Sequence, residues 1–292
     1  MMSGTCTAVA RRGGLAAMAS SVAMLAVVPA AQAQTWRNAE LSRQLRDSAP
    51  HEVSVTYAGG RFTLLAADRG VLYDARIRYD EERGTPVVSY DRAGRSLDID
   101  VELEEESNTG GQTRFGEMRL ALSPLVPLDL DIELGAVEGD ISLGGLALSS
   151  VSVEAGASSS RVSFDTPNRI AMARLDLHAG AASLTATNLA NANAREIRVA
   201  AGVGNLDLDF GGQWTRDIDA TVDIALGRAR IHVPASVGIR VEMSKVLARF
   251  HHPGLVKQGE AWVSTNWESA SHRLTLRMNT TFGSVEIDRG GG

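Results

Sequence analysis

Residues 200–210 read AAGVGNLDLDF, and the glycines Gly202 and Gly204 in this stretch admit two interpretations. A phosphate-binding glycine loop needs a strand before it and a helix after it, because the helix N-terminus supplies amides to the phosphate. Here polar and apolar residues alternate from Asn205 to Phe210, which is the period-2 pattern of a strand. Asp207 replaces the third glycine of the motif, and its charge would repel a phosphate. The stretch therefore indicates a bend between two strands, and no nucleotide cofactor is expected.

The same order of a small-residue bend and an alternating strand recurs along the chain. The recurring segments are VEGDISL (137–143), SSSRVSF (158–164), AASLTAT (181–187), GVGNLDL (202–208), GRARIHV (227–233) and TFGSVEI (281–287). When the segments are aligned on Ile141, Val162, Leu184, Leu206, Ile231 and Val285, the first four steps are 21, 22, 22 and 25 residues. The last step is longer because a divergent unit around 247–250 and a loop intervene. A period near 22 residues with two strands per unit is typical of a solenoid, whose units bury their apolar faces on one another.

The glycines of the repeat have a structural interpretation. Gly202, Gly204, Gly227 and Gly283 fall at the bends, where a positive φ or close packing against the next coil is expected. We also expect Asn188, Asn191 and Asn193 to form hydrogen bonds at a corner between coils.

The first 33 residues have the features of a cleavable signal peptide. Arg11 and Arg12 precede an apolar stretch at 15–28, and Ala31-Gln32-Ala33 forms an A-x-A cleavage site. Cleavage near Ala33 predicts a periplasmic or secreted protein.

The single cysteine, Cys6, lies in the part that is removed, so no disulfide or thiolate metal site is expected. No later segment has 18 consecutive apolar residues, so the mature chain is expected to lack a transmembrane segment.

The remaining chain is predicted to contain two β-rich parts. Residues 35–47 are expected to form a short helix, and strands follow from His51 onward. The polar segment 104–113 is the predicted linker between an N-terminal domain at 34–103 and a solenoid at 114–292. The formal net charge of −6 is spread along the chain, so nucleic acid is not an expected partner.

Two regions carry a resemblance to a known family. Residues 61–101 contain Leu72, Ala75, Ile77 and Tyr79, followed by Pro86, Val88 and Tyr90, and this order resembles the N-terminal toast-rack domain of bacterial envelope proteins. Residues 226–244 and 262–288 resemble the LiaF-like, cell-wall-antibiotic-response type of β-solenoid. The resemblance implies a β-solenoid that contacts something at the cell surface, in envelope-stress sensing or in adhesion, and it supplies no catalytic residues. LiaF-type proteins carry membrane helices before the soluble part, whereas a cleavable signal is expected in this chain instead.

Several polar clusters were candidates for chemistry. The adjacent pair His251-His252 points to opposite faces of a strand, so a metal site there is not expected. The acids Asp98, Asp100, Glu102 and Glu104 alternate with apolar residues and suggest a solvated strand face, with a calcium site as the alternative. A second group of acids, Asp207, Asp209, Asp217, Asp219 and Asp223, leaves a carbohydrate-active enzyme open, because polysaccharide lyases and hydrolases use carboxylates on β-solenoids.

Three tryptophans are candidates for contact with a partner. Trp214, Trp262 and Trp267 lie in or next to expected loops, where an indole ring can stack on a sugar or anchor a protein. The alternative for Trp262 and Trp267 is that they cover the end of the solenoid core.

The sequence thus predicts an all-β fold, namely a single-stranded β-helix or toast-rack solenoid with coils of about 22 residues, preceded by a smaller β-rich segment. The predicted function is non-catalytic: an exported envelope protein that binds an envelope protein or a cell-surface glycan. No catalytic residue, metal site or cofactor is expected. The alternatives are a carbohydrate-active β-helix enzyme and a purely structural surface protein.

Overall fold

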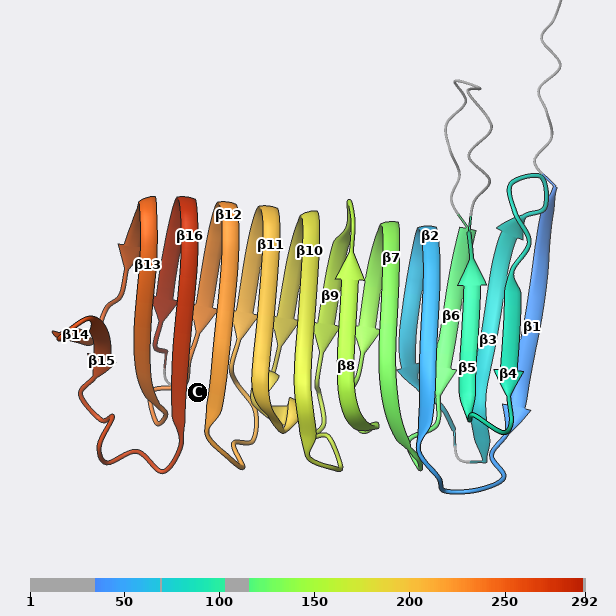
Figure 1. The fold of residues 1–292 in the computed structure, drawn as a ribbon, viewed down its shortest axis with the longest axis horizontal. Coiled ribbons are helices and arrows are strands. Elements are labelled where there is room, and N and C mark those ends of the chain that lie inside the picture. The colour runs from blue at the N-terminus through green and yellow to red at the C-terminus, as the bar shows by residue number, and fades with distance from the viewer. Residues whose placement is uncertain (1–34, 69, 103–115, 291–292) are drawn as a thin grey trace, which may run out of the picture. The chain divides into compact units, whose positions relative to one another are not determined.

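The computed structural model describes residues 35–68, 70–102 and 116–290, and these residues form an all-β structure (Figure 1). The predicted signal peptide at 1–33 and the predicted linker at 104–113 lie outside the described residues. The strands are β1 (Trp36–Gln44), β2 (His51–Ala66), β3 (Val71–Asp80), β4 (Val87–Asp91), β5 (Ser96–Val101), β6 (Gly116–Leu122), β7 (Pro127–Ser142), β8 (Ala147–Ala155), β9 (Ser159–Ser163), β10 (Met172–Thr187), β11 (Ala194–Asp209), β12 (Ile218–His232), β13 (Gly238–His251), β14 (Leu255–Gln258), β15 (Ala261–Ser264) and β16 (Arg273–Asp288). Within the described ranges the only helical element is the short 3-10 turn η1 (Leu189–Ala192), and no helix there has the length and apolarity to span a membrane.

Long parallel strands lie side by side through most of the structure. Their order is β2, β7, β8, β10, β11, β12, β16 and β13, with β9 beside β7 and β10 (Figure 1). Leu184 pairs with Leu206, Leu206 with Ala229, and Ala229 with Val285, so equivalent positions form columns that cross the strands. β16 lies between β12 and β13, so the last strand in sequence is not the last in space. The divergent unit at 247–250 belongs to β13 and lies beyond β16.

The core follows from the alternation within each strand. Leu206 and Leu208 of β11 are buried, whereas Asn205 is exposed and Asp207 faces outward between them. Because successive side chains of a strand point to opposite faces, strands that pair in register place all their apolar residues on the same side. The buried apolar residues consequently form one continuous cluster from β2 to β16.

The register corrects three steps of the predicted repeat. Val162 pairs with Ala186 rather than with Leu184, and Ile231 pairs with Leu208 rather than with Leu206. Val285 pairs with Ala229 rather than with Ile231. Each error is a slip of two residues. A slip of two keeps every side chain on its own face, so the apolar pattern alone does not distinguish the two alignments. The step from Ile141 to Val162 and the step from Leu184 to Leu206 agree with the pairing.

The N-terminal region departs from the sequence prediction at one element. Residues 36–44 form strand β1 and not a helix, and β1 pairs in antiparallel fashion with β3. Ala39 and Leu41 pack against the core from one face of β1, which is the spacing of a strand. Strand pairing along β3 thus determines the structure of this segment.

Strands on both sides of the predicted linker share one sheet. β2 pairs with β6 along its second half and with β7 along most of its length. Because β2 precedes residues 104–113 and β6 and β7 follow them, the two predicted parts are joined by strand pairing. The position of a boundary at 104–113 stays a prediction.

Asparagines tie successive loops together at the corner that η1 forms. Asn191 Nδ2 donates to the carbonyl of Phe164, and its Oδ1 accepts from the amide of Gln213. Asn193 Nδ2 donates to the carbonyl of Ile170. The predicted corner hydrogen bonds are thus present for Asn191 and Asn193, while Asn188 contributes a left-handed backbone conformation.

Candidate functional site

An open groove of about 1250 Å³ crosses the parallel strands from β2 to β13. Its floor is a row of residues with small or no side chains: Ala58, Gly135, Gly156, Gly180, Gly202 and Ala225. One wall carries outward-facing side chains: Thr56, Glu133, Glu154, His178, Asp223 and Asn279. The groove is therefore a continuous feature of the stacked strands and does not belong to any one loop.

The floor arises from the register of the strands. Ala179 pairs with Ala201 and Ala181 pairs with Val203, so Gly180 and Gly202 between them occupy the same column. A Cβ on Gly202 would lie 2.8 Å from the carbonyl oxygen of Gly180, closer than real Cβ atoms approach an oxygen. Glycine at these positions lets neighbouring backbones lie close together and leaves the surface without side chains.

The positive φ angles lie two residues further along, at the bends. Gly204, Gly227 and Gly283 have φ angles of 147°, 149° and 132° and pair with one another across β11, β12 and β16. Gly202 is not among the glycines with positive φ in the described residues. The two glycines of the 200–210 stretch thus have different roles: Gly202 lies on the groove floor, and Gly204 forms the bend.

The polar wall consists of side chains stacked in register. Glu133 pairs with Glu154, which pairs with His178 on the next strand. Further along the same column, Asp223 accepts a hydrogen bond of 2.6 Å from Asn279 Nδ2. The described residues that line the groove include no lysine or arginine. Such a wall can accept hydrogen bonds from hydroxyl or amine donors that repeat along the groove.

Tyr57 of β2 is one of the buried residues that line the groove. Its side chain is buried, and burial raises the pKa of its phenol above the usual value of 10.0. The phenol is therefore neutral across the physiological range and supplies no charge to the groove.

The three candidate tryptophans are separated in the structure. Trp214 Nε1 donates to the carbonyl of Phe210, and its ring lies 6.4 Å from that of His272. Trp262 packs against the core, and Trp267 lies under the guanidinium of Arg273 at 5.8 Å. Among the described residues, no ring contact joins any two of these tryptophans, and none of them lines the groove. Contact of these tryptophans with a partner stays a prediction.

The histidines and acids singled out in the sequence lie in several places. The ring of His252 lies 3.8 Å from that of Trp262, while His251 is exposed on the opposite face. Asp217 Oδ1 accepts from the backbone amide of Arg273, and Asp209 accepts from that of Gly211. Of the second group of acids, only Asp223 lines the groove.

In the part of the chain that the structure describes, no three His, Cys, Asp or Glu side chains are placed to hold a metal ion. Glu104 of the predicted calcium alternative lies outside that part.

Sequence reasoning did not find the groove. The signal was present as a small residue at Gly135, Gly156, Gly180, Gly202 and Ala225. Each lies two positions after a residue of one column: Glu133, Glu154, His178, Ala200 and Asp223. Of these residues only Gly202 was singled out from the sequence, and it was interpreted as a bend, because the register that aligns it with the others was not established.

Comparison with known proteins identifies the N-terminal part of the chain. Residues 32–169 match the family described as the N-terminal domain of toast_rack. The match ends at residue 169, so the resemblance of the C-terminal part to LiaF-type proteins stays a prediction. No curated protein is significantly similar to this chain.

Solved structures show a distant likeness over most of the chain. A "putative cell adhesion protein" from Clostridium sporogenes is 14% identical with a TM-score of 0.44, over 87% of this chain and 100% of its own. "Putative adhesins" from Parabacteroides merdae and Parabacteroides distasonis are 9% and 11% identical, with TM-scores of 0.41 and 0.39. Each alignment covers 87% of this chain, with 96% and 98% of those two proteins.

Proposed function

We propose that this chain, which belongs to the toast-rack N-terminal domain family through residues 32–169, is an exported, non-catalytic envelope protein that binds an extended partner along the groove. In this proposal the parallel strands are successive coils of a β-solenoid of about 22 residues per coil, and the groove crosses the coils. The observation that carries the proposal is the continuity of the groove from β2 to β13.

The geometry of the groove favours a linear polymer that lies across the strands. Neighbouring strands are about 4.8 Å apart, so the wall presents one side chain at each such step. These side chains are polar from β2 to β16 except at Ala200 on β11. Glu133, Glu154 and Asp223 can accept hydrogen bonds, and the described lining residues include no lysine or arginine that would pair with an anionic polymer. A neutral surface glycan supplies donor hydroxyls at a comparable spacing, and we propose it as the partner.

The positions of the carboxylates argue for binding rather than catalysis. Glycoside hydrolysis uses two carboxylates on either side of the scissile bond. Glu133 and Glu154 are register partners and stand side by side on one wall. Because these two carboxylates stand on the same side of a bound polymer, the pair can orient it through hydrogen bonds but does not enclose a single bond between an acid and a base.

A carbohydrate-active enzyme is the second candidate function, because Glu133 and Glu154 are two neighbouring carboxylates in the groove. Carboxylates on neighbouring strands are separated by about one strand spacing, close to the roughly 5 Å of retaining glycosidases. Reducing-end release from any glycan that binds, abolished by Glu154→Gln, would favour the enzyme.

Glycan microarrays of bacterial surface polysaccharides test the proposal. The groove variant Glu133→Gln/Glu154→Gln is expected to lose at least tenfold in apparent affinity for the glycan that the wild type binds. The matched control Asp131→Asn/Asp140→Asn removes two exposed carboxylates of β7 outside the groove and is expected to bind as the wild type does. Equal binding by the groove variant would exclude the groove as the binding surface.

A further inference from the structure

A row of exposed apolar side chains follows the bends of the last four strands of the stack. Val203, Leu226, Phe282 and Leu247 are register partners on β11, β12, β16 and β13, and we call them the apolar ridge. Their exposed fractions are 50%, 49%, 45% and 68%. Single exposed apolar side chains are common on protein surfaces, but a contiguous row of large ones indicates an interaction surface.

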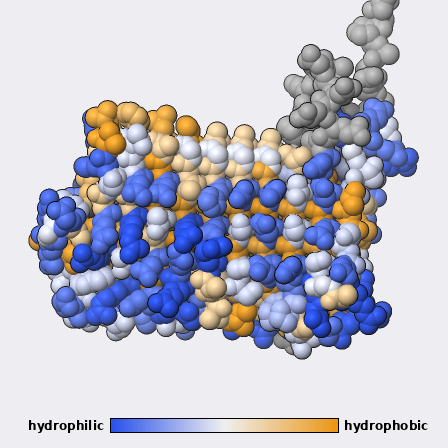
Figure 2. All heavy atoms as spheres, viewed as in Figure 1, coloured by the Kyte–Doolittle hydropathy of each residue, from blue (hydrophilic) through white to orange (hydrophobic). Residues whose placement is uncertain are grey.

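The apolar ridge is confined to one end of the stack. On β10 the same column holds Ala181, and on β7 and β2 it holds Ala136 and Gly59. Side-chain size therefore increases from glycine to leucine and phenylalanine toward β13. Figure 2 shows this as a hydrophobic patch above β12, β16 and β13 that continues as a paler band toward β2.

Cationic side chains flank the apolar ridge. Arg228 and Arg249 occupy one column beyond the glycine bends, and Lys245 lies two residues before Leu247. All three are exposed, and in the described part of the chain none of them forms an ion pair. On the same strands, Asp223 accepts a hydrogen bond from Asn279, and Glu286 lies 3.6 Å from Arg230.

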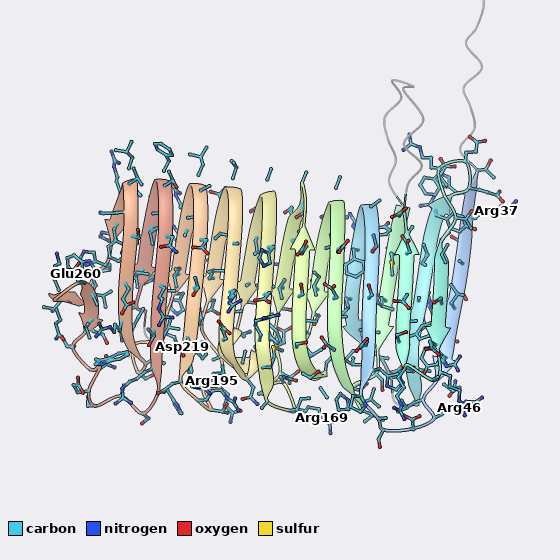
Figure 3. The ribbon with its side chains drawn as sticks, in the orientation of Figure 1. Arg37, Arg46, Arg169, Arg195, Asp219 and Glu260 are labelled. Atoms are coloured by element: carbon cyan, nitrogen blue, oxygen red, sulfur yellow. The ribbon has the colours of Figure 1, made fainter. Side chains whose placement is uncertain are left out.

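The opposite margin of the same strands is polar. Arg195 of β11 and Asp219 of β12 lie toward it, near the starts of their strands (Figure 3), and Figure 2 shows mainly hydrophilic atoms along that margin. The strands thus present one apolar margin at the bends and one polar margin at the loops.

We propose that the apolar ridge inserts into the surface of an anionic phospholipid bilayer, with Arg228, Lys245 and Arg249 against the lipid phosphates. The ridge follows the outside of the bends, so it fits between lipid headgroups better than into a flat protein surface. Apolar side chains flanked by Lys and Arg are the combination that binds a membrane interface. The surface is separate from the polar wall of the groove.

A second copy of this chain is a poorer occupant. Contact between two ridges brings Arg228, Lys245 and Arg249 of both copies together, and like charges repel. Four partly exposed side chains also offer much less than the roughly 800 Å² that each partner contributes to a stable protein interface.

Vesicle flotation tests the proposal with protein purified from cells that express the full chain. The probes are vesicles of phosphatidylcholine alone and vesicles of equal parts phosphatidylcholine and phosphatidylglycerol. We expect flotation only with the anionic vesicles, and a decrease as salt is added. The ridge variant Leu226→Ser/Phe282→Ser/Leu247→Ser and the charge variant Arg228→Glu/Arg249→Glu are each expected to float at least tenfold less.

The control variant is Val87→Ser/Val256→Ser, which removes two exposed valines from other places and is expected to float like the wild type. Thermal unfolding of every variant verifies its fold. Absence of wild-type flotation, equal flotation of the ridge variant, or equal flotation on neutral vesicles overturns the proposal. Dimerisation that the ridge variant abolishes, without flotation, assigns the surface to a second copy and also overturns it.

Discussion

Gly204 and Gly227 are register partners on neighbouring parallel strands, and a Cβ on Gly227 would overlap the backbone carbonyl of Gly204. The same overlap recurs between Gly283 and Gly227. The bends of β11, β12 and β16 can stack at this distance only if none of these residues has a side chain.

We therefore expect Gly227→Ala to lower the free energy of unfolding by about 3 kcal/mol or more, because a positive φ and a backbone clash act together. Urea denaturation followed by circular dichroism measures the change. The matched control is Gly254→Ala: Gly254 also has a positive φ, 77°, but nothing lies within 4 Å of its Cβ position. The control is expected to lose about 1 kcal/mol. Equal losses for both variants would show that close packing of the bends has no part in stability.

Asn191 is expected to contribute more stability than an exposed asparagine. Asn191→Ala leaves the amide of Gln213 and the carbonyl of Phe164 without their side-chain partners, in a buried corner. Each such loss costs about 1–3 kcal/mol, so a decrease of about 2–6 kcal/mol in the free energy of unfolding is expected for the two together. Asn205→Ala on the exposed face of β11 serves as the control and should change it by less than about 0.5 kcal/mol.

Tyr57 gives a prediction for alkaline pH. Because burial raises the pKa of its phenol in the folded state, the unfolded chain releases this proton first. The contribution to stability is complete below pH 10 and falls as the pH rises above 10. Tyr57→Phe should remove this part of the alkaline loss, measured as the difference between the two unfolding curves.

The same variant tests the surroundings of the phenol at neutral pH. Within the described residues the hydroxyl of Tyr57 has no hydrogen-bond partner. Its removal should leave the free energy of unfolding unchanged or raise it by about 1 kcal/mol. A loss of more than about 1 kcal/mol would reveal a hydrogen bond to that hydroxyl.

A substitution at Trp262 tests whether this residue covers the end of the core or contacts a partner. Its ring lies 3.8 Å from that of His252 and 6.1 Å from that of Phe250, and it packs against the core beside β13. Trp262→Ala is expected to lower the free energy of unfolding by about 2–4 kcal/mol. Val256→Ala, on the adjacent strand and 55% exposed, should change it by less than about 0.5 kcal/mol. If the Trp262 variant kept its stability but no longer bound the partner of the wild type, Trp262 would be a contact residue and not a cap.

The fold class could be predicted because alternation and turn chemistry are local properties of the sequence. Apolar and polar residues alternate strictly from 206 to 209, which is the pattern of a strand. The pairing of Leu184 with Leu206 followed from the spacing of the repeated segments. The two-residue slips at Val162, Ile231 and Val285 arose because a period of two is insensitive to such shifts. The order of β16 and β13 was not predictable, since it depends on which strand pairs with β12 in space.

The groove and the apolar ridge depend on that register. Gly180 and Gly202 form a floor only when their strands are aligned, and Val203 and Phe282 form a row only when β16 lies next to β12. The helix expected at 35–47 failed for a similar reason, because pairing with β3 outweighs the weak local preference of the segment.

The most direct test of the central claim is photo-crosslinking in the native envelope from a single position in the groove. A photoreactive amino acid replaces His178 on the groove wall or, as the control on the same strand, Ser183 outside the groove. We predict an adduct from position 178 alone, with sugars identified in it by mass spectrometry. A protein adduct from that position would keep the groove as the binding surface and change the class of partner. No adduct from position 178, or equal adducts from both positions, would contradict binding along the groove.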